Sequence, residues 1–572
     1  MDTEELDVLI IGAGPTGLTL ALELALQQHG QQRQRVKFRI IDREPEPSPY
    51  SRALVVQPRT LELLARYGFD DLLSRMLDRG RAVTGMTWSF TPTREARFQF
   101  SDMGSDDTEF PLSFNVSQTE TERFLLSCLE IALGVDGSRV PVVERGVEAE
   151  SVVQDADGAT VTLVKRDGGD DPGTKETVRC KYVIGADGAR SIVRKASTTI
   201  TFDGKTYPHD FIICDAYLSD THLPLDRINI NVHGPFVGIF PVGGDIVRIA
   251  SMREPGAELT GLPALEEFQY ILTNRAGRAA AMGRLHDPIW MTNFRIHCRC
   301  ASRYRDGRLF IAGDAAHIHS PVGGQGMNAG LQDAINLGWK LSAVLRGAAD
   351  ESLLDTYEEE RRPIGLELLR TTDNMFRFFA TTNRFLIWLR ALIGPWLPPL
   401  LVGTQARRRR FFKWITMLSI SYRGSSSIVA TATGFKGPVM GGDRAPDGKL
   451  LVSPAIAATA ETTTTTTTNL HRLIAGVRHH LVLFAGDTAT EDDLIQFAAK
   501  VVARENEIPV VMIFPGDEGS LVPKNAYRDP ESVLHKRYGL GSKAGYVLVR
   551  PDQYVAHIGY ISSVEELVAS LG

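Results

Sequence analysis

The N-terminal region alternates short apolar runs with polar turns, a pattern typical of a β-turn-α-turn-β unit. Residues 7–11 predict a short buried strand, and the Ala- and Leu-rich run from Leu18 to about Leu26 predicts a helix. A second strand is expected from Val36 to Ile41, after a polar insertion at residues 29–35. Helical spacing recurs at residues 59–67 and 119–133, and strand-like runs recur at 160–164 and 182–185.

Between about residues 200 and 300 the pattern changes to short β-branched and aromatic runs broken by Gly, Pro and Asp. Such spacing predicts an antiparallel sheet. The runs are Asp210–Leu218, Ile228–Val232, Val237–Pro241 and Ile246–Met252. A further buried strand, Leu309 to Ala312, leads into a long helix that begins near Gly326.

The C-terminal part predicts a separate α/β module. Residues 455–468 are low in complexity and include seven consecutive threonines, Thr462 to Thr468, which indicates a linker or flexible loop. The module that follows has strand-like runs at 480–484, 510–514 and 546–550 and a helical stretch at 491–503.

The segment from Phe385 to Val402 is strongly apolar but does not fit a membrane span. It contains Arg390 and three prolines, and ~18 residues of helix reach about 27 Å, short of the ~30 Å hydrocarbon core. No integral membrane segment is therefore expected. Two interpretations stay open: a buried or packed helical region, or a weak membrane-surface contact made with the basic run Arg407 to Arg410.

Composition argues against several classes of protein. With 63 Lys and Arg against 69 Asp and Glu, the net charge of -6 argues against a nucleic-acid partner. The five cysteines are scattered and form no CxxC, so neither a disulfide framework nor a metal site is expected. Because no basic region precedes the first apolar run, an intracellular, cytoplasmic location is the expectation.

The first turn carries the motif Gly12-x-Gly14-x-x-Gly17 between a strand and a helix. Gly12 permits a tight turn, Gly14 lets the backbone approach a pyrophosphate, and Gly17 allows the helix to pack closely on the strand. The helix N-terminus offers N–H groups to phosphates, and Asp42 can accept hydrogen bonds from an adenosine ribose. The motif predicts a dinucleotide site but does not separate FAD from NAD.

Two later segments distinguish an FAD site from an NAD site. Tyr182–Ser191 is a strand that ends in a Gly/Asp turn, and Leu309–His317 is another, followed by Pro321 and the turn Gly323–Asn328. Here the chain resembles the class A flavoprotein monooxygenases, the para-hydroxybenzoate hydroxylase and phenol 2-monooxygenase type. That family carries a GxGxxG, a DG and a GD motif in this order, and the resemblance covers residue 5 to about residue 450.

Shorter segments extend the resemblance. They are Ser51–Ala53, Gln57–Glu62, Gln118 before a helix, Tyr357–Pro363 and Gly442–Pro446. The C-terminal module, with Leu548–Asp552, looks like the thioredoxin-like domain attached to phenol 2-monooxygenases. Without a CxxC, that module should have no dithiol redox activity and should serve as an interaction or dimer-supporting domain, so a homodimer is one possible assembly.

The resemblance implies an α/β fold in three parts. They are a Rossmann-like FAD-binding domain of the glutathione-reductase type, an interleaved mixed-sheet substrate domain and a C-terminal thioredoxin-like α/β domain. The expected boundaries are residues 1–200 and 300–375 for the FAD-binding domain, 201–299 for the substrate sheet, 376–454 for a helical connecting region, 455–468 for the linker and 469–572 for the C-terminal domain.

The resemblance also implies roles for single residues. Asp314 would hydrogen-bond the ribityl chain of FAD, and Gly324 to Asn328 would place a helix N-terminus beside the flavin N1–C2=O edge, where reduced flavin carries negative charge. Arg52 and Gln118 would contact the flavin, ribityl or phosphate groups. The full set of expected cofactor residues is Gly12, Gly14, Pro15, Thr16, Gly17, Asp42, Arg43, Arg52, Gln57, Gln118, Asp187, Gly188, Asp314, Pro321, Gly324, Gly326, Met327 and Asn328.

The implied activity is that of an FAD-dependent monooxygenase that consumes NADPH or NADH and O2. A flavin C4a-hydroperoxide would hydroxylate a phenolic or related small aromatic substrate. The absence of a second GxGxxG fits a family in which NAD(P)H docks transiently on the surface. Two alternatives stay open: a Baeyer–Villiger monooxygenase or epoxidase of the same fold in secondary metabolism, and a redox-silent flavin-binding protein.

The residues that contact the substrate are harder to predict from the sequence. In phenol 2-monooxygenases an Asp lies three positions before the Gln that matches Gln57, and here that position is Leu54, which puts the catalytic base in doubt. The sheet near residues 200–300 should form an aromatic pocket over the flavin. Candidates for substrate contact or catalysis, by location alone, are Arg248, His233, Asp215 and Tyr207, with Arg295 and His297 beside them.

Overall fold

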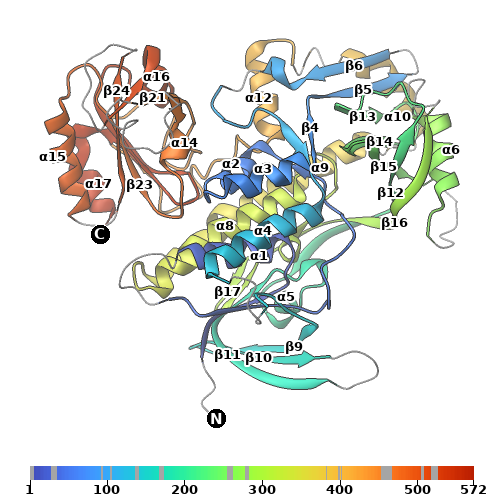
Figure 1. Cartoon of the computed structure of the whole chain (residues 1–572), viewed down its shortest axis with the longest axis horizontal. Helices are drawn as coiled ribbons and strands as arrows, with labels where there is room; N and C mark the ends of the chain where they lie inside the picture. Colours follow the sequence, from blue (N-terminus) through green and yellow to red (C-terminus); the bar gives the residue numbers. More distant parts are fainter. Residues whose placement is uncertain are drawn as a thin grey trace. The chain divides into compact units, whose positions relative to one another are not determined.

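The computed structural model divides into two compact units (Figure 1). It describes residues 5–27, 35–91, 94–103, 106–135, 141–166, 173–253, 262–276, 283–379, 381, 383–396, 400, 402–452, 467–503, 508–516 and 526–571. The first unit comprises Met1–Thr60, Asp70–Gly104 and Leu112–Met417, and the second comprises Leu61–Phe69, Ser105–Pro111 and Leu418–Gly572. The expected Thr-rich linker lies outside the described residues except for its last two positions.

A mainly parallel sheet forms the base of the first unit, with the strand order β17-β18-β11-β1-β2-β8. Its strands are β1 (Leu6–Ile11), β2 (Phe38–Asp42), β8 (Glu144–Arg145), β11 (Thr174–Gly185), β17 (Arg305–Asp306) and β18 (Leu309–Ile311). The hairpin of β9 (Val147–Gln154) and β10 (Ala159–Lys165) extends β11. Val8 to Ile11 is apolar without interruption and fully buried, as is typical of a parallel strand covered on both faces.

Three helices lie side by side against this sheet, with α1 (Pro15–Leu26) between α4 (Gln118–Leu133) and α8 (Gly326–Leu345) (Figure 1). The contact between α1 and α8 is close because Gly338 has no side chain; a Cβ there would lie 2.5 Å from the Cβ of Glu23. The β-α-β unit expected from the sequence is therefore confirmed, and its helix begins at the proline of the glycine-rich turn.

The second sheet of this unit has the order β19-β16-β12-β15-β14-β13-β5-β6. Its strands are β5 (Gly85–Thr91), β6 (Arg94–Gln99), β12 (Phe202–Ser219), β13 (Arg227–Asn231), β14 (Val237–Gly243), β15 (Ile246–Met252), β16 (Arg284–Ala301) and β19 (His317–Ile318). The expected antiparallel pairing holds except between β13 and β5, which run parallel. The sequence missed the 18-residue β16, whose charged, partly exposed residues hide the alternation of a strand.

The two faces of this sheet differ. Helix α6 (Leu265–Arg275) covers one face, and Phe268 and Leu272 pack there against apolar strand residues such as Ile239 and Ile249. Because successive strand residues point to opposite faces, Asp215, Arg248 and Phe240, which are paired across β12, β15 and β14, lie on the other face. We call this second face the inner face.

The region after the parallel sheet is helical. It contains α9 (Asp355–Phe379), α10 (Arg384–Ile393) and α12 (Gln405–Ile415). The expectation of a buried or packed region from Phe385 onward is wrong for one side of α10, because Phe385 is 65% and Trp388 58% exposed. The pattern of apolar residues does not reveal this exposure, because a buried helix and an unpartnered apolar face have the same composition.

The second unit is an α/β module around a sheet of order β20-β27-β26-β23-β24-β25-β21-β22. Its strands are β20 (Ala430–Thr431), β21 (Lys449–Val452), β22 (Thr467–Asn469), β23 (His480–Phe484), β24 (Val510–Pro515), β25 (Tyr527–Asp529), β26 (Gly545–Val549) and β27 (Val555–Tyr560). Helices α15 (Glu491–Val502) and α17 (Val564–Ser570) pack together against the sheet. The module extends further toward the N-terminus than residue 469, because β20 and β21 belong to its sheet, and its thioredoxin-like character stays a prediction.

A buried ion pair explains one of the short sequence matches in the second unit. Arg444, within the segment Gly442–Pro446, donates through Nε to Glu62 at 2.8 Å and also lies against Asp107. All three side chains are nearly inaccessible. Breaking such a pair would leave an uncompensated buried charge, so these residues hold the distant segments of the unit together.

Candidate active site

The three turns named by the sequence motifs meet at one end of the parallel sheet. The N–H of Ala186 donates to the carbonyl of Ile11 at 2.8 Å, which joins the DG turn to the first turn. The N–H of Ala312 donates to the carbonyl of Gly185 at 3.0 Å, which joins the GD turn to the DG turn. A Cβ on Gly313 would lie 2.6 Å from Oγ1 of Thr16, so the first and third turns are also in direct contact.

The glycines of the first turn serve different purposes. Gly12 has a φ of +103°, and a Cβ there would lie 2.4 Å from the carbonyl oxygen of Ala186. A Cβ on Gly17 would lie 1.9 Å from the carbonyl oxygen of Gly12. Nothing lies within 4 Å of a Cβ built on Gly14. The first two glycines are therefore required by the protein's own packing, whereas Gly14 borders open space in front of the N-terminus of α1.

The carboxylate of Asp42 closes this turn. It accepts from the N–H of Ala13 at 2.7 Å through one oxygen and from the N–H of Glu44 at 2.9 Å through the other. Arg43 is exposed and pairs with Glu44 at 3.1 Å. Asp42 is thus fixed at the mouth of the turn, where its remaining acceptor capacity faces the position expected for a ribose.

The GD turn presents an unsatisfied carboxylate. No hydrogen bond to the Asp314 side chain occurs among the described residues, and the side chain is exposed. Burial raises the pKa of this carboxyl, while His317 and Arg52 act in the opposite direction. Asp314 therefore lies in a recess that protein surrounds but solvent reaches, which suits a residue expected to bind the hydroxyls of a ribityl chain.

The turn before α8 is built around Gly323 and Gly324, which have φ values of +96° and +60°. Pro321 is exposed at its start, and α8 begins at Gly326, followed by Met327 and Asn328. A helix of 20 residues directs a partial positive charge out of this end. The arrangement suits the negative edge of a reduced flavin.

Gln57, Asn328 and Gln118 make protein contacts in addition to any they make to a cofactor. Asn328 accepts from the N–H of Gln57 at 2.8 Å and donates to the carbonyls of Val55 and Gly324. Gln57 donates to the carbonyl of Gly323 at 3.1 Å. Gln118 accepts from the N–H of Ala53 at 3.2 Å. These amides hold the segment 51–57 against the turn before α8.

Asp187 and Gly188 form the DG turn itself. Asp187 accepts from the N–H of Ile192 at 2.7 Å, which fixes the start of helix α5 (Ile192–Ala196). Burial raises the pKa of the Asp187 carboxyl. Gly188 has a φ of +74°, a conformation that favours glycine. Asp187 therefore shapes the turn, and direct contact with FAD remains a prediction.

A buried network braces the GD turn, and sequence reasoning gave it no role. Asp333 on α8 accepts from His317 Nε2 at 2.7 Å, from Arg361 Nε at 2.8 Å and from the N–H of Gly313 at 3.1 Å. Burial alone would raise the pKa of Asp333, but His317 and Arg361 outweigh it and lower that pKa. Tyr357 donates to the carbonyl of Ile311 at 2.9 Å. The family match at Tyr357–Pro363 was the sequence feature that could have pointed to this network.

On the inner face, Arg248 and Asp215 form a two-point ion pair with distances of 2.7 and 2.8 Å. Arg248 also donates to the carbonyls of Ser51 at 2.5 Å and Arg52 at 3.0 Å. Both side chains are buried. The pair thus attaches the segment that carries Arg52 to the sheet, which is a positioning role; a direct role in catalysis stays a prediction.

The other substrate-side candidates lie apart from this pair. The Tyr207 hydroxyl donates to Asp373, and burial together with that carboxylate raises the pKa of Tyr207. His233 is half-buried, and burial lowers its pKa. The exposed Arg295 pairs with Asp210 at 3.1 Å, and His297 contacts Thr206 at 2.8 Å. Arg295 and His297 lie opposite Asp210 and Thr206 in the β12–β16 pairing, close to Tyr207, whereas His233 lies between β13 and β14.

Aromatic side chains gather beside the inner face. Trp88 on β5 contacts Phe90, Phe98 and Phe379 at ring-centroid distances of 6.3, 5.0 and 5.6 Å, and Phe236 contacts Phe379 at 6.3 Å. We call these five residues the aromatic cluster. The Nε1–H of Trp88 is buried, and the described part of the chain offers it no hydrogen-bond acceptor. A buried donor left unpaired is costly, so this N–H is a candidate to bind a substrate oxygen.

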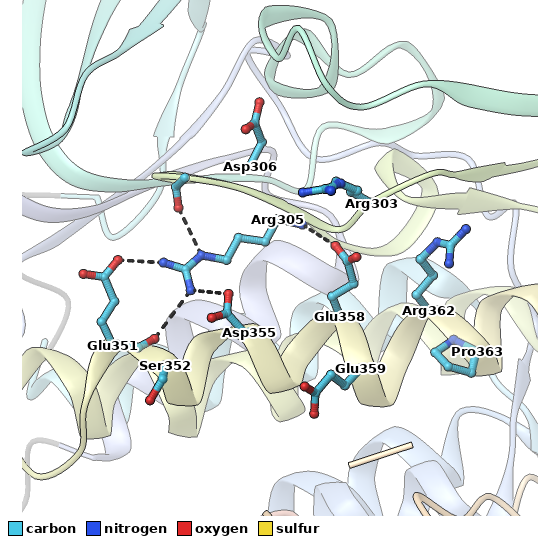
Figure 2. A pocket seen from close by; sticks show the side chains of 11 residues that line it. Arg303, Arg305, Asp306, Glu351, Ser352, Asp355, Glu358, Glu359, Arg362 and Pro363 are labelled. Carbon is cyan, nitrogen blue, oxygen red and sulfur yellow. Dashed lines mark hydrogen bonds and ion pairs between the residues drawn. The ribbon is translucent and has the colours of Figure 1, made fainter. Parts of the chain in front are cut away.

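An open cavity of about 760 Å³ lies elsewhere, at the beginning of β18 and along α9 (Figure 2). Its lining is mostly charged, and Arg305 pairs there with Glu351 at 2.6 Å and with Asp355 at 2.8 Å. Since the GD turn follows the opposite end of β18, this cavity is not the cofactor site. Its side chains attach β17 to α9.

Comparison with known proteins agrees with this geometry. Residues 5–372, more than half of the chain, match the family described as "FAD binding domain". The chain belongs to this FAD-binding family. It is 32% identical to 6-methylpretetramide 4-monooxygenase of Streptomyces rimosus over 99% of this chain and 92% of the relative. It is 30% identical to pentachlorophenol 4-monooxygenase of Sphingobium chlorophenolicum over 96% and 93%.

A solved structure extends the likeness to the whole chain. OxyS anhydrotetracycline hydroxylase from Streptomyces rimosus superposes with a TM-score of 0.72 at 28% identity and covers 99% of this chain and 98% of its own. With full-length relatives of this kind, the chain is an FAD-dependent monooxygenase. The expectation drawn from the three motifs is confirmed.

The residues present fit FAD. The space in front of Gly14, the unpartnered Asp314 and the start of α8 provide, respectively, room for a pyrophosphate, an acceptor for ribityl hydroxyls and a positive helix end. All five cysteines are buried free thiols. Among the described helices, none combines the length and the apolar character needed to cross a bilayer.

Proposed function

We propose that this FAD-dependent monooxygenase hydroxylates an electron-rich ring of a phenolic or fused-ring aromatic substrate bound at the inner face. The observation that carries the proposal is the attachment of the segment 51–52 to the inner face through Arg248, with Arg52 close enough to Asp314 to offset part of the rise that burial causes in the pKa of that carboxyl. The cofactor recess and the aromatic side of the sheet are therefore joined by one short segment.

The relatives support the substrate class. Their names specify a pretetramide, an anhydrotetracycline and a chlorinated phenol, which share a hydroxylated aromatic ring. The aromatic cluster offers flat apolar surfaces of matching chemistry, since aromatic rings favour stacked or edge-to-face contacts with one another. Fused rings would use more of this surface than a single ring.

The chain's own residues would bind and orient the cofactor and the substrate, and they would exclude water from the site. Asp314 and the start of α8 would hold the cofactor, while the aromatic cluster would surround the substrate and the Trp88 N–H would bind one of its oxygens. When bound, FAD supplies the transfer of electrons from NAD(P)H to O2 that introduces the oxygen atom. NAD(P)H itself is expected to dock transiently. A homodimer and a cytoplasmic location also stay predictions.

The test is substrate-stimulated turnover of the purified, yellow holoenzyme. Simple phenols and fused-ring phenols are compared for their effect on NAD(P)H consumption, and product mass is measured after reaction under 18O2. We expect fused-ring phenols to accelerate consumption most and to gain one labelled oxygen on an intact ring. Label found in a lactone or an epoxide would replace the proposal with one of the alternative reactions. A flavin that NAD(P)H never reduces would indicate a redox-silent protein.

A further inference from the structure

Helix α10 presents an apolar face that no described residue covers. Seven of the seventeen exposed large apolar side chains of the described chain lie on α10 or shortly after it, including Trp396 at 68% exposure. We call them the apolar stripe: Phe385, Leu386, Trp388, Leu392, Ile393, Trp396 and Leu400. A patch this concentrated marks an interaction site, unlike scattered exposed apolar residues.

The other side of α10 fixes the direction of the stripe. Arg390 is buried and donates to the carbonyls of Phe378 and Phe379 at 2.7 and 2.9 Å. Gly394 lies against Phe90, because a Cβ there would be 2.3 Å from the ring. Positions three and four residues apart share a helix face, so Phe385, Trp388 and Leu392 point away from this packing. The exposure is a consequence of the helix's orientation.

The chain segment that carries the stripe has charged residues of one sign. Residues 374–417 contain no Asp or Glu, although the whole chain has a net charge of -6. The basic residues of this segment are Arg377, Arg384, Arg390, Arg407, Arg408, Arg409, Arg410 and Lys413. Arg407 and Arg410 are exposed on α12, and Arg407 donates to the carbonyl of Leu400 at 3.1 Å. The basic run is thereby tied to the end of the apolar stripe.

We propose that the apolar stripe and the basic run of α12 together form a docking surface for an anionic lipid membrane. A helix with Trp, Phe and Leu on one face and basic residues nearby lies in the interface of a bilayer, with its apolar face among the acyl chains. Tryptophan favours the headgroup region, and clustered arginines are attracted to anionic lipids. Since no described helix can span a bilayer, the contact is peripheral.

A second copy of the chain fits this surface less well. A two-fold dimer places the same patch on both sides of the interface. It would bring two copies of the exposed Arg407 and Arg410 close to one another, and residues 374–417 supply no acidic residue to oppose them. An anionic lipid surface instead supplies the opposite charge.

The position of the docking surface gives it a consequence for the enzyme. Gly394 begins the 3-10 turn η5 (Gly394–Trp396) after α10 and contacts Phe90 of the aromatic cluster. Gln325 at the start of α8 donates to the carbonyls of Trp414 and Ile415 at the end of α12. Membrane docking would therefore bring the bilayer close to the substrate side and favour uptake of apolar substrates. Only this consequence depends on the proposed function; the lipid contact itself does not.

The test is flotation of the FAD-loaded holoenzyme with vesicles, monitored by flavin absorbance. We expect binding to vesicles of mixed phosphatidylcholine and phosphatidylglycerol and little binding to pure phosphatidylcholine, with the difference lost at high salt. Trp388→Ser/Leu392→Ser should weaken binding about tenfold by removing buried apolar area. Arg407→Glu/Arg410→Glu should weaken it by more than about tenfold.

Matched control variants carry the same kinds of substitution outside the docking surface. Val153→Ser removes an apolar side chain that is 66% exposed on β9, and Arg166→Glu/Lys175→Glu makes the same charge change just after β10 and on β11, where both residues pair with carboxylates of β9. Both controls should bind vesicles like the wild type. Retained flavin and an unchanged unfolding midpoint in all variants exclude misfolding as the cause of lost binding.

Three outcomes would overturn the proposal. Absence of binding to any vesicle excludes a lipid surface, and equal binding to neutral and anionic vesicles excludes the role of the basic run. A dimer that Trp388→Ser/Leu392→Ser converts to monomer, without vesicle binding, assigns the stripe to a second copy. Because flotation needs no turnover, a failure here is distinguishable from a failure of the proposed hydroxylation.

Discussion

The three cofactor turns meet through backbone atoms, whereas the inner face of the antiparallel sheet is made of side chains. Between the turns, carbonyls of Ile11 and Gly185 accept hydrogen bonds, and the missing side chain of Gly12 avoids a contact of 2.4 Å with the carbonyl oxygen of Ala186. On the inner face, Arg248 and Trp88 come from strands far apart in sequence, and a shift of one residue would turn either to the opposite face.

This difference has a functional meaning. A rigid backbone frame suits the binding of one fixed cofactor, while side chains on a sheet face can be replaced one at a time to suit a particular substrate. Substitutions in the turns should therefore remove flavin, and substitutions on the inner face should change substrate use with flavin retained.

The largest effect is expected for Asp333→Asn. The substitution leaves the buried Arg361 without its carboxylate and weakens the bond to the N–H of Gly313, so the free energy of unfolding should fall by about 3–5 kcal/mol. Flavin content should fall with it. Denaturant unfolding and the ratio of flavin to protein absorbance measure both. Asp355→Asn is the control, because its exposed pair with Arg305 should contribute less than about 1 kcal/mol.

The next effect compares two glycines of one turn. Gly17→Ala forces a Cβ against the carbonyl of Gly12 and should destabilise the protein by about 1–3 kcal/mol even without flavin. Gly14→Ala meets no protein atom, so the apoprotein should unfold like the wild type while its affinity for FAD falls. Titration of apoprotein with FAD measures the affinity. Wild-type affinity in Gly14→Ala would contradict the placement of the pyrophosphate.

On the inner face, the double variant Arg248→Met/Asp215→Leu should retain flavin and stability. Replacing both members of a buried ion pair by apolar residues is often neutral, in contrast to removing one member. The carbonyls of Ser51 and Arg52 lose their donor, so the segment beside the substrate should be held less firmly. We expect a fall of about tenfold in kcat/KM for the substrate, on the order of 1.4 kcal/mol. Loss of flavin would show that the pair serves the cofactor side.

Trp88→Phe removes the unpaired Nε1–H and little apolar surface. If that N–H binds a substrate oxygen, KM should rise by about three- to tenfold, corresponding to a net hydrogen bond of about 0.5–1.5 kcal/mol. Substrate-stimulated NAD(P)H consumption measures the change, and a substrate analogue without the oxygen should show no difference between the two enzymes. Equal loss for both substrates would assign Trp88 to packing alone.

The three cofactor turns could be predicted from the sequence because each is marked by a short local motif. Gly12, Asp187 and Asp314 each end a buried strand, and parallel strands bring such ends to one edge of a sheet. The hydrogen-bond network around Asp333 could not be predicted from the sequence, because its partners His317 and Arg361 lie 16 and 28 residues away on other elements. Tertiary geometry alone brings them together.

The inner face was predicted only as a location. Candidates such as Asp215 and Arg248 were named separately, and their pairing depends on the register of β12 and β15, which short runs do not specify. Tyr207 and Arg295 proved to have separate carboxylate partners. The exposed face of α10 was missed for a related reason: hydrophobic periodicity identifies an apolar face but not what covers it.

The smallest effect concerns pH and the turn before α8. Burial lowers the pKa of His319 from 6.5 to about 4, and its Nε2 is buried without a partner beside Gly326. Between these two pKa values the imidazole binds a proton in the unfolded chain but not in the folded chain. The free energy of unfolding should therefore be highest above pH 6.5 and fall as the pH drops toward 4. His319 is partly accessible, so the loss should be on the order of 1 kcal/mol. His319→Gln should remove this part of the slope, measured as the difference in unfolding free energy between pH 7 and pH 4.5. An unchanged slope would mean that groups other than His319 carry the acid sensitivity of the protein.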